Sequence, residues 1–116
     1  MPVLLLTTTG RRSGRERTTP LTYFQSDSNL VIVASNGGED RPPAWWLNLR
    51  ADPHATVTIG RRAEQVTARA ATEEEYARLW PTITSTHAGY AAYAARTTRP
   101  IPVMLLSGTI ENAPSR

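Results

Sequence analysis

The chain has 116 residues, of which 40% are hydrophobic, and its 13 basic and 10 acidic side chains leave a formal net charge of +3. This length accommodates one core, so residues 1–116 are expected to form a single domain. The absence of cysteine excludes disulfides, thiolate metal sites and a cysteine nucleophile, and the 2 histidines, His54 and His87, lie far apart without the carboxylate-rich segment of a metal site.

Any redox chemistry therefore requires a bound organic cofactor, because these side chains cannot carry it alone. No apolar run approaches the roughly 20 residues that span a bilayer, and Met1–Leu6 is too short for the apolar core of a signal peptide. We therefore expect a cytoplasmic protein. All 13 basic residues are arginine, and 4 of them fall within Arg11–Arg17, which makes that segment a candidate site.

The beginning of the chain predicts a β-hairpin followed by a buried strand. Pro2–Thr9 is apolar and then threonine-rich, which predicts a first strand, and Gly10–Gly14 predicts a turn. Alternation over Arg17–Gln25 predicts the partner strand, with Pro20 at a bulge or an edge. After a turn at Ser26–Asn29, the apolar run Leu30–Ser35 predicts a strand buried on both faces.

The middle of the chain combines a short helix with a second hairpin. The pattern of large apolar residues predicts a helix over Ala44–Ala51, preceded by a proline that suits a helix start. Alternation predicts strands over His54–Gly60 and Arg61–Ala71, which a tight glycine turn joins.

The last third predicts two helices and a closing strand. Thr72 and Glu75 have the spacing of a capping box, and the helix that they begin is kinked or ended by Pro81. A second helix is predicted over His87–Arg96 and a last strand over Ile101–Ile110. The fold class is therefore α+β, mainly β, with about six antiparallel strands and short inserted helices in a small closed or split barrel.

Four segments have the composition of a ligand site. In Gly10–Arg17, glycines can turn backbone N–H groups toward an anion while arginines bind its oxygens in pairs, although a solvated basic turn explains these residues equally well. Val33–Gly38 ends a buried strand with small residues that could leave backbone open to a flat ligand; an ordinary exit from a strand is the commoner explanation.

The other two segments are helical. The adjacent Trp45 and Trp46 point in different directions, so one can pack in the core while the other shapes a pocket, or both can belong to the core. His87, Tyr90 and Tyr93 share one face of a predicted helix, where they can line a substrate pocket or donate a proton, or can simply pack.

Together these segments resemble the deazaflavin-dependent nitroreductase family, which includes the F420H(2)-dependent quinone reductases of actinobacteria. The resemblance extends from about Val3 to Val103 and rests on LLLTTTGRRSGRERTTPL, VIVASNGG, PPAWWLNLRADPHATVTIG, ATEEEYARLWP and YAAYAARTTRPIPV in the order of the family. It implies a split β-barrel related to FMN-binding barrels. It also implies hydride transfer from reduced coenzyme F420 to quinones, activated enones or nitroaromatic compounds.

The resemblance implies a cofactor site, a substrate wall and candidate catalytic groups. The cofactor residues would be Arg11, Arg12, Ser13, Arg17, Thr18, Thr19, Pro20, Leu21, Thr22, Val33, Ala34, Ser35, Asn36, Ala44, Trp45, Trp46, Leu47, Asn48 and Tyr90. The substrate residues would be His87, Tyr90 and Tyr93, and the catalytic residues Tyr90, Tyr93 and Ser35. His87 stands where family members often have tyrosine, which leaves the substrate range open. Members also commonly have a helical segment before the first strand, whereas this chain begins almost at that strand.

Three other functions stay open. The same fold could bind FMN instead of F420, or could bind F420 without catalysis. A small barrel with an arginine-rich loop could also hold a nucleic-acid backbone, but aromatic residues are not interleaved with the arginines, and we expect no nucleic acid as a partner. The expected partner is a small-molecule electron acceptor, no metal is expected, and a monomer is favoured. Peripheral contact with a membrane is left open.

Overall fold

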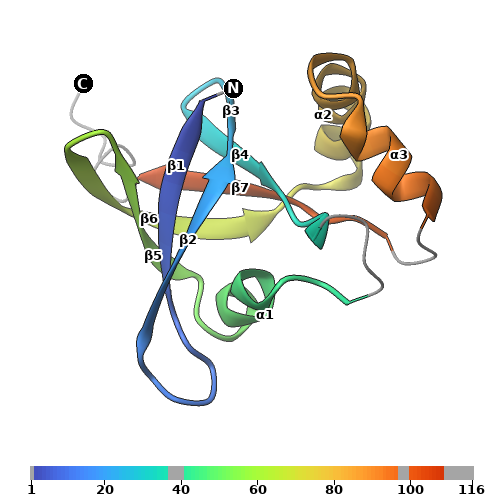
Figure 1. Ribbon diagram of the computed structural model, residues 1–116. Helices are drawn as coiled ribbons and strands as arrows, with labels where there is room; N and C mark the ends of the chain where they lie inside the picture. Colours follow the sequence, from blue (N-terminus) through green and yellow to red (C-terminus); the bar gives the residue numbers. More distant parts are fainter. Residues whose placement is uncertain (1, 37–40, 97–99, 109–116) are drawn as a thin grey trace.

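A curled antiparallel sheet forms the body of the protein (Figure 1). The computed structural model describes residues 2–36, 41–96 and 100–108. The strands of the sheet are β1 (Val3–Thr9), β2 (Glu16–Thr22), β3 (Phe24–Ser26), β4 (Asn29–Val33), β5 (His54–Ile59), β6 (Arg62–Ala70) and β7 (Val103–Gly108). They lie in the order β2-β1-β5-β6-β7-β4-β3, and every pair is antiparallel.

The two edges of this sheet are continuous in the chain. β2 and β3 occupy opposite edges, yet Tyr23 alone separates them in sequence. The sheet must therefore curl until its edges meet, and the Tyr23 N–H donates a hydrogen bond to the Pro2 carbonyl oxygen (3.2 Å) at that point. The predicted split barrel is confirmed. It has 7 strands, because the strand predicted over Arg17–Gln25 is divided at Tyr23 between pairing with β1 and pairing with β4.

Both predicted hairpins are confirmed. β1 and β2 pair from Val3↔Thr22 to Thr9↔Glu16, and Pro20 lies in an edge strand, where its missing N–H leaves no neighbouring strand without a donor. β5 and β6 are joined at Gly60, whose φ of +61° is the left-handed conformation that favours glycine.

The side chains form two apolar clusters on the two faces of the sheet. Inside the curl lie Leu4, Leu6, Ile32, Ala34, Trp45, Leu49, Ala55, Val57, Val66, Ala68, Met104 and Leu106. Outside it, under the later helices, lie Val31, Val33, Leu79, Ile83, Tyr90, Ile101, Val103 and Leu105. β4 contributes to both clusters, so the prediction of a strand buried on both faces is confirmed.

Three helices cover the sheet at two places. α1 (Ala44–Ala51) closes one end of the curl, whereas α2 (Glu73–Thr86) and α3 (Gly89–Arg96) lie together beyond β4 and β7 (Figure 1). The capping box of α2 is confirmed: the Thr72 hydroxyl accepts from the Glu75 N–H, and the Glu75 carboxylate accepts from the Thr72 N–H. No helix in the described part of the chain is long and apolar enough to cross a membrane.

Several predicted boundaries differ from the structure, among them that of the strand predicted over Leu30–Ser35, which ends at Val33. Pro81 lies inside α2 and does not end it, because buried Leu79 and Ile83 hold the helix on the sheet on both sides of the proline. The next helix begins at Gly89, not His87, because the His87 N–H still closes α2 by donating to the Ile83 carbonyl oxygen (2.9 Å). The last strand spans Val103–Gly108 within the described residues, and Thr109 and Ile110 lie outside them.

Candidate functional site

Two adjoining hollows run along β2 and the beginning of α1. The first, of about 620 Å³, is lined by Gly10, Arg11, Arg12, Ser13, Glu16, Arg17, Thr18, Thr19, Ala44, Trp45 and Asn48. The second, of about 430 Å³, is lined by Thr19, Pro20, Leu21, Thr22, Val33, Ser35, Asn36, Pro43, Ala44, Trp45 and Tyr90. Thr19, Ala44 and Trp45 belong to both, so the hollows form one groove with two ends. Each volume lies in the range typical of small-molecule sites.

The loop between β1 and β2 shapes the first end of the groove. The Gly10 N–H donates to the Arg15 carbonyl oxygen (2.7 Å), and the Gly14 N–H donates to the Gly10 carbonyl oxygen (2.9 Å). A side chain at Gly10 would place its Cβ 2.8 Å from the Ser13 Oγ and 3.1 Å from the Arg15 carbonyl oxygen, so the closed loop favours glycine there. Ser13 itself accepts from the Arg15 N–H (3.1 Å) and keeps its own hydroxyl proton for a ligand.

Asn48 on α1 fixes this loop to the barrel. Its Oδ1 accepts from the Arg11 N–H (3.1 Å) and from the Arg11 Nη1 (3.3 Å), and its Nδ2 donates to the Thr8 Oγ1 (3.2 Å). Asn48 and Thr8 are 3% and 2% exposed, so these bonds satisfy polar groups that water cannot reach. The arginine loop is therefore held by a buried hydrogen-bond network as well as by its own turn.

The first end of the groove carries uncompensated positive charge. Within the described ranges, neither Arg12 nor Arg17 pairs with a carboxylate, and the ion pairs found there, Asp52–His54 and Arg69–Glu75, lie outside this groove. Unpaired guanidinium groups beside a serine hydroxyl are donors suited to phosphate and carboxylate oxygens. Glu16 is the acidic residue in the same lining and limits the surplus.

The second end is walled by apolar groups and one tyrosine. Pro20, Leu21, Val33 and Trp45 supply the apolar wall, and Tyr90, only 8% exposed, reaches the hollow from α3. Burial, and secondarily the charge of Tyr93, raises the pKa of the Tyr90 hydroxyl above its ordinary value of 10. The hydroxyl is protonated at neutral pH, as a tyrosine with a pKa of 10 or above must be, and can donate a hydrogen bond.

The predicted tyrosine face is only partly in the groove. The Tyr90 ring lies 4.7 Å from the His87 ring, 6.0 Å from Tyr93 and 6.2 Å from Phe24 by their centroids. As far as the described residues define the hollow, Tyr90 lines it whereas His87 and Tyr93 flank Tyr90. Any role of His87 and Tyr93 in binding substrate stays a prediction.

Most of the predicted cofactor residues come together in the groove, including residues far apart in sequence, but Ala34, Trp46 and Leu47 are not part of its lining. Ala34 is packed inside the curl, and its N–H donates to the Pro102 carbonyl oxygen (2.9 Å). Trp46 packs against the same core from the other side of α1, with the Arg50 guanidinium 5.0 Å from its ring centroid. Gly37 and Gly38 of the predicted glycine segment lie outside the described residues.

The groove is also lined by Pro43, Gly10 and Glu16, which were absent from the cofactor residues that the resemblance implied. Gly10 and Glu16 stand inside the arginine segment, so their positions were a usable signal. Pro43 precedes α1 and has no feature that separates a cavity wall from an ordinary helix start.

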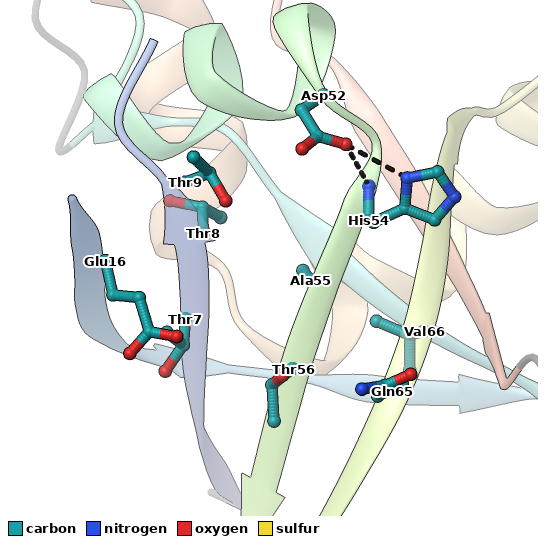
Figure 2. Close-up of a pocket in the computed structure, with 10 residues that line it drawn as sticks. All are labelled: Thr7, Thr8, Thr9, Glu16, Asp52, His54, Ala55, Thr56, Gln65 and Val66. Atoms are coloured by element: carbon teal, nitrogen blue, oxygen red, sulfur yellow. Dashed lines mark hydrogen bonds and ion pairs between the residues drawn. The ribbon is translucent and has the colours of Figure 1, made fainter. Parts of the chain in front are cut away.

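A third hollow, of about 270 Å³, is lined by residues of β1, β2, β5 and β6 and by Asp52 (Figure 2). Figure 2 shows Glu16 and Thr7 on one side of it and the Asp52–His54 pair on the other. The Asp52 carboxylate accepts from the His54 N–H (3.1 Å) and contacts the His54 Nδ1 (3.0 Å), and these interactions lower the pKa of Asp52. This hollow has the carboxylates of Glu16 and Asp52 and no arginine in its lining, so it suits a polyanion less well than the groove along β2, which is the candidate site.

Comparison with known proteins identifies the family of this chain. Residues 1–108 match the F420H(2)-dependent quinone reductase family. The F420H(2)-dependent quinone reductase Rv1261c of Mycobacterium tuberculosis is 42% identical over 109 residues, which cover 91% of this chain and 73% of that protein.

Solved structures give the same result for the fold. A structure of an F420-H2 dependent reductase, FDR-A, superposes with a TM-score of 0.81 at 34% identity, covering 91% of this chain and 94% of that one. Another, described as a domain-swapped dimer, has a TM-score of 0.82 at 34% identity over 91% of this chain and 80% of that one. A FAD-binding protein from Mesorhizobium loti, 14% identical with a TM-score of 0.65 over 93% of this chain and 81% of that one, shares the fold alone. On its sequence match and its fold, the chain belongs to the F420H(2)-dependent quinone reductase family, whose cofactor is coenzyme F420.

Proposed function

We propose that this protein binds reduced coenzyme F420 in the groove along β2 and reduces quinones, and also activated enones and nitroaromatic compounds. The observation that carries the proposal is the polarity of the groove. Unpaired arginines line one end, and an apolar wall with a protonated tyrosine lines the other. A cofactor that joins an anionic tail to a flat ring matches both ends at once.

Arg11, Arg12, Ser13 and Arg17 would hold the phosphate and the glutamyl tail of the cofactor. The guanidinium groups supply paired N–H donors and positive charge, and the Ser13 hydroxyl adds a further donor. Asn48 already occupies one N–H of the Arg11 guanidinium, which limits the orientations of that side chain before a ligand arrives. Binding then costs less side-chain entropy than it would with a mobile arginine.

Pro20, Leu21, Val33 and Trp45 would flank the ring system at the other end. Their apolar surfaces exclude water from the place where acceptor and cofactor meet. When bound, reduced F420 supplies a hydride from its C5 atom. The contribution of this chain is to fix the distance and the angle between that ring and the acceptor.

Tyr90 would donate a hydrogen bond to the acceptor oxygen. The neutral hydroxyl lies in the lining of the groove, so it can stabilise the negative charge that develops as an acceptor is reduced. Ser35 lines the same end of the groove and is the second candidate for contact with the reacting groups.

The experiment is a fluorescence titration of the purified protein with F420, repeated with FMN as competitor, followed by a quinone-reduction assay. We expect saturable F420 binding that FMN does not displace, and oxidation of reduced F420 that depends on the quinone. Arg12→Ala should weaken F420 binding, whereas Arg61→Ala, at the exposed β5–β6 turn, is the matched control and should not. Binding of FMN alone would assign the protein to a flavin, and F420 binding without turnover would make it a binding protein.

We also propose that the protein acts as a monomer. The two edges of the sheet meet at Tyr23 within one chain, so closure of the barrel requires no strand from a second copy. Light scattering after size-exclusion chromatography tests this, and a mass of two chains would instead favour the arrangement described for the domain-swapped relative.

A further inference from the structure

Gly89, the first residue of α3, is not explained by its backbone. The described glycines with positive φ are Gly14 and Gly60, so the conformation at Gly89 is one that alanine also adopts. Alanine would even favour a helix more than glycine does. The reason for glycine must therefore lie in the surrounding space.

The imidazole of His87 fills that space. A Cβ at Gly89 would lie 3.0 Å from His87 Cε1, 3.1 Å from His87 Nδ1 and 3.7 Å from Tyr93 Cζ. The first two distances are shorter than normal van der Waals contacts, so an added methyl group would move the imidazole. The ring of His87 therefore lies beside the first residue of α3.

The ring of His87, which such a methyl group would displace, is the nearest aromatic neighbour of Tyr90. The two centroids are 4.7 Å apart, compared with 6.0 Å to Tyr93 and 6.2 Å to Phe24. The Tyr90 N–H also donates a hydrogen bond to the His87 carbonyl oxygen (3.1 Å). Both the backbone and the side chain of His87 therefore contact Tyr90. Tyr90 in turn lines the apolar end of the groove, which His87 does not.

We propose that Gly89 is a positioning residue: it leaves room for His87 to hold the Tyr90 ring in its place beside the electron acceptor. Gly89 and His87 then act through Tyr90, without touching the acceptor themselves. This inference rests on the proposed function in one respect, that Tyr90 faces the acceptor. The geometry of the three residues does not depend on it.

The test is a double-mutant cycle of Gly89→Ala and His87→Ala, with kcat and KM for a quinone and the Kd for F420 as readouts. Gly89→Ala should lower kcat/KM by about 3- to 10-fold, the effect of forcing one side chain off its preferred rotamer, and should leave the F420 Kd unchanged. In the His87→Ala background the space is free, so Gly89→Ala should change kcat/KM by less than about 2-fold. Equal losses in both backgrounds would overturn the proposal.

A second measurement needs no turnover. The chain has 2 histidines, so the imidazole proton resonances of His87 can be assigned in an NMR spectrum by comparison with His54→Gln. At the observed separation, the ring current of Tyr90 should shift these resonances. Gly89→Ala should change their positions in the spectrum, and the variant protein should unfold at the same temperature as wild type or at a higher one. Unmoved His87 resonances would overturn the proposal even if the protein reduces quinones. Moved resonances in a protein without F420-dependent turnover would support the positioning and refute the proposed function.

Discussion

Replacing Asn48 with alanine should both destabilise the protein and weaken its hold on an anionic ligand. The side chain is 3% exposed and makes three hydrogen bonds, two from Arg11 to its Oδ1 and one from its Nδ2 to Thr8 Oγ1. Alanine removes all three. It also leaves the Thr8 hydroxyl, itself 2% exposed, without the donor that the structure provides.

The expected loss can be worked out from these contacts. A hydrogen bond contributes about 1 kcal/mol net, and a buried polar group left without its partner costs roughly 1–3 kcal/mol. The exposed Arg11 can recover its bonds from water, so the Thr8 contact and the vacated volume dominate. We expect a decrease of about 2–3 kcal/mol in the free energy of unfolding, or a fall of roughly 10 °C in Tm for a domain of this size.

Thermal unfolding measures the stability, and F420 fluorescence measures the binding. Asn29→Ala is the matched control, since within the described residues the Asn29 side chain makes no hydrogen bond; it should change stability by less than about 0.5 kcal/mol. Thr8→Val in a double-mutant cycle with Asn48→Ala should give a coupling of about 1 kcal/mol. If Asn48→Ala lowers Tm no more than Asn29→Ala does, the buried network does not hold the arginine loop.

Three further predictions address the groove and an exposed ion pair. Tyr90→Phe should keep the Kd for F420 and slow turnover by roughly 10²-fold, the usual effect of removing one donor to a developing negative charge; unchanged kcat with several acceptors would exclude Tyr90 from the mechanism. Arg12→Ala should weaken F420 binding at low salt, and the difference from wild type should shrink as salt screens the charge, so a salt-independent loss would contradict a role in ionic binding. The Arg69 guanidinium, with help from the Thr72 N–H, lowers the pKa of Glu75 to about 2 from an ordinary value of 4.5. The stability that this carboxylate contributes is therefore present above about pH 4.5 and is lost as pH falls toward 2. The Tm difference between wild type and Glu75→Gln should vanish over that window. A Tm difference that stays constant from pH 6 to 2 would refute the stabilising role of the Arg69–Glu75 pair.

Local patterns predicted most of the elements because their causes are local. The capping box of α2 needs only Thr72 and Glu75 three residues apart, and the apolar run of β4 reports burial on both faces directly. The division of the strand at Tyr23 was not predictable in this way. Alternation continues through Tyr23, and it carries no information on which neighbouring strand accepts the hydrogen bonds on each side.

The site shows the same limit at longer range. The arginine segment and the tyrosine face stood out by composition, but the contacts that organise them join distant residues. Asn48 bonds to Thr8 and Arg11 across 40 and 37 positions. The spacing of His87, Tyr90 and Tyr93 suggested one helix face, whereas His87 belongs to the end of α2, and its ring lies beside Tyr90 in the space that Gly89 leaves free.

Trp45 shows why the groove and the core cannot be varied separately. The sequence left open which of the two adjacent tryptophans would pack inside, and the structure assigns Trp45 both roles: it is 5% exposed, belongs to the inner cluster and lines both hollows. Truncating it would open a cavity costing about 3–5 kcal/mol, and any loss of binding would then be inseparable from loss of structure. Arg12→Glu avoids this difficulty because Arg12 is an exposed residue of the groove lining, so the substitution reverses one charge at the arginine end without disturbing the core. Weaker F420 binding at nearly unchanged Tm would show that the charge of the groove, and not only its shape, selects the ligand.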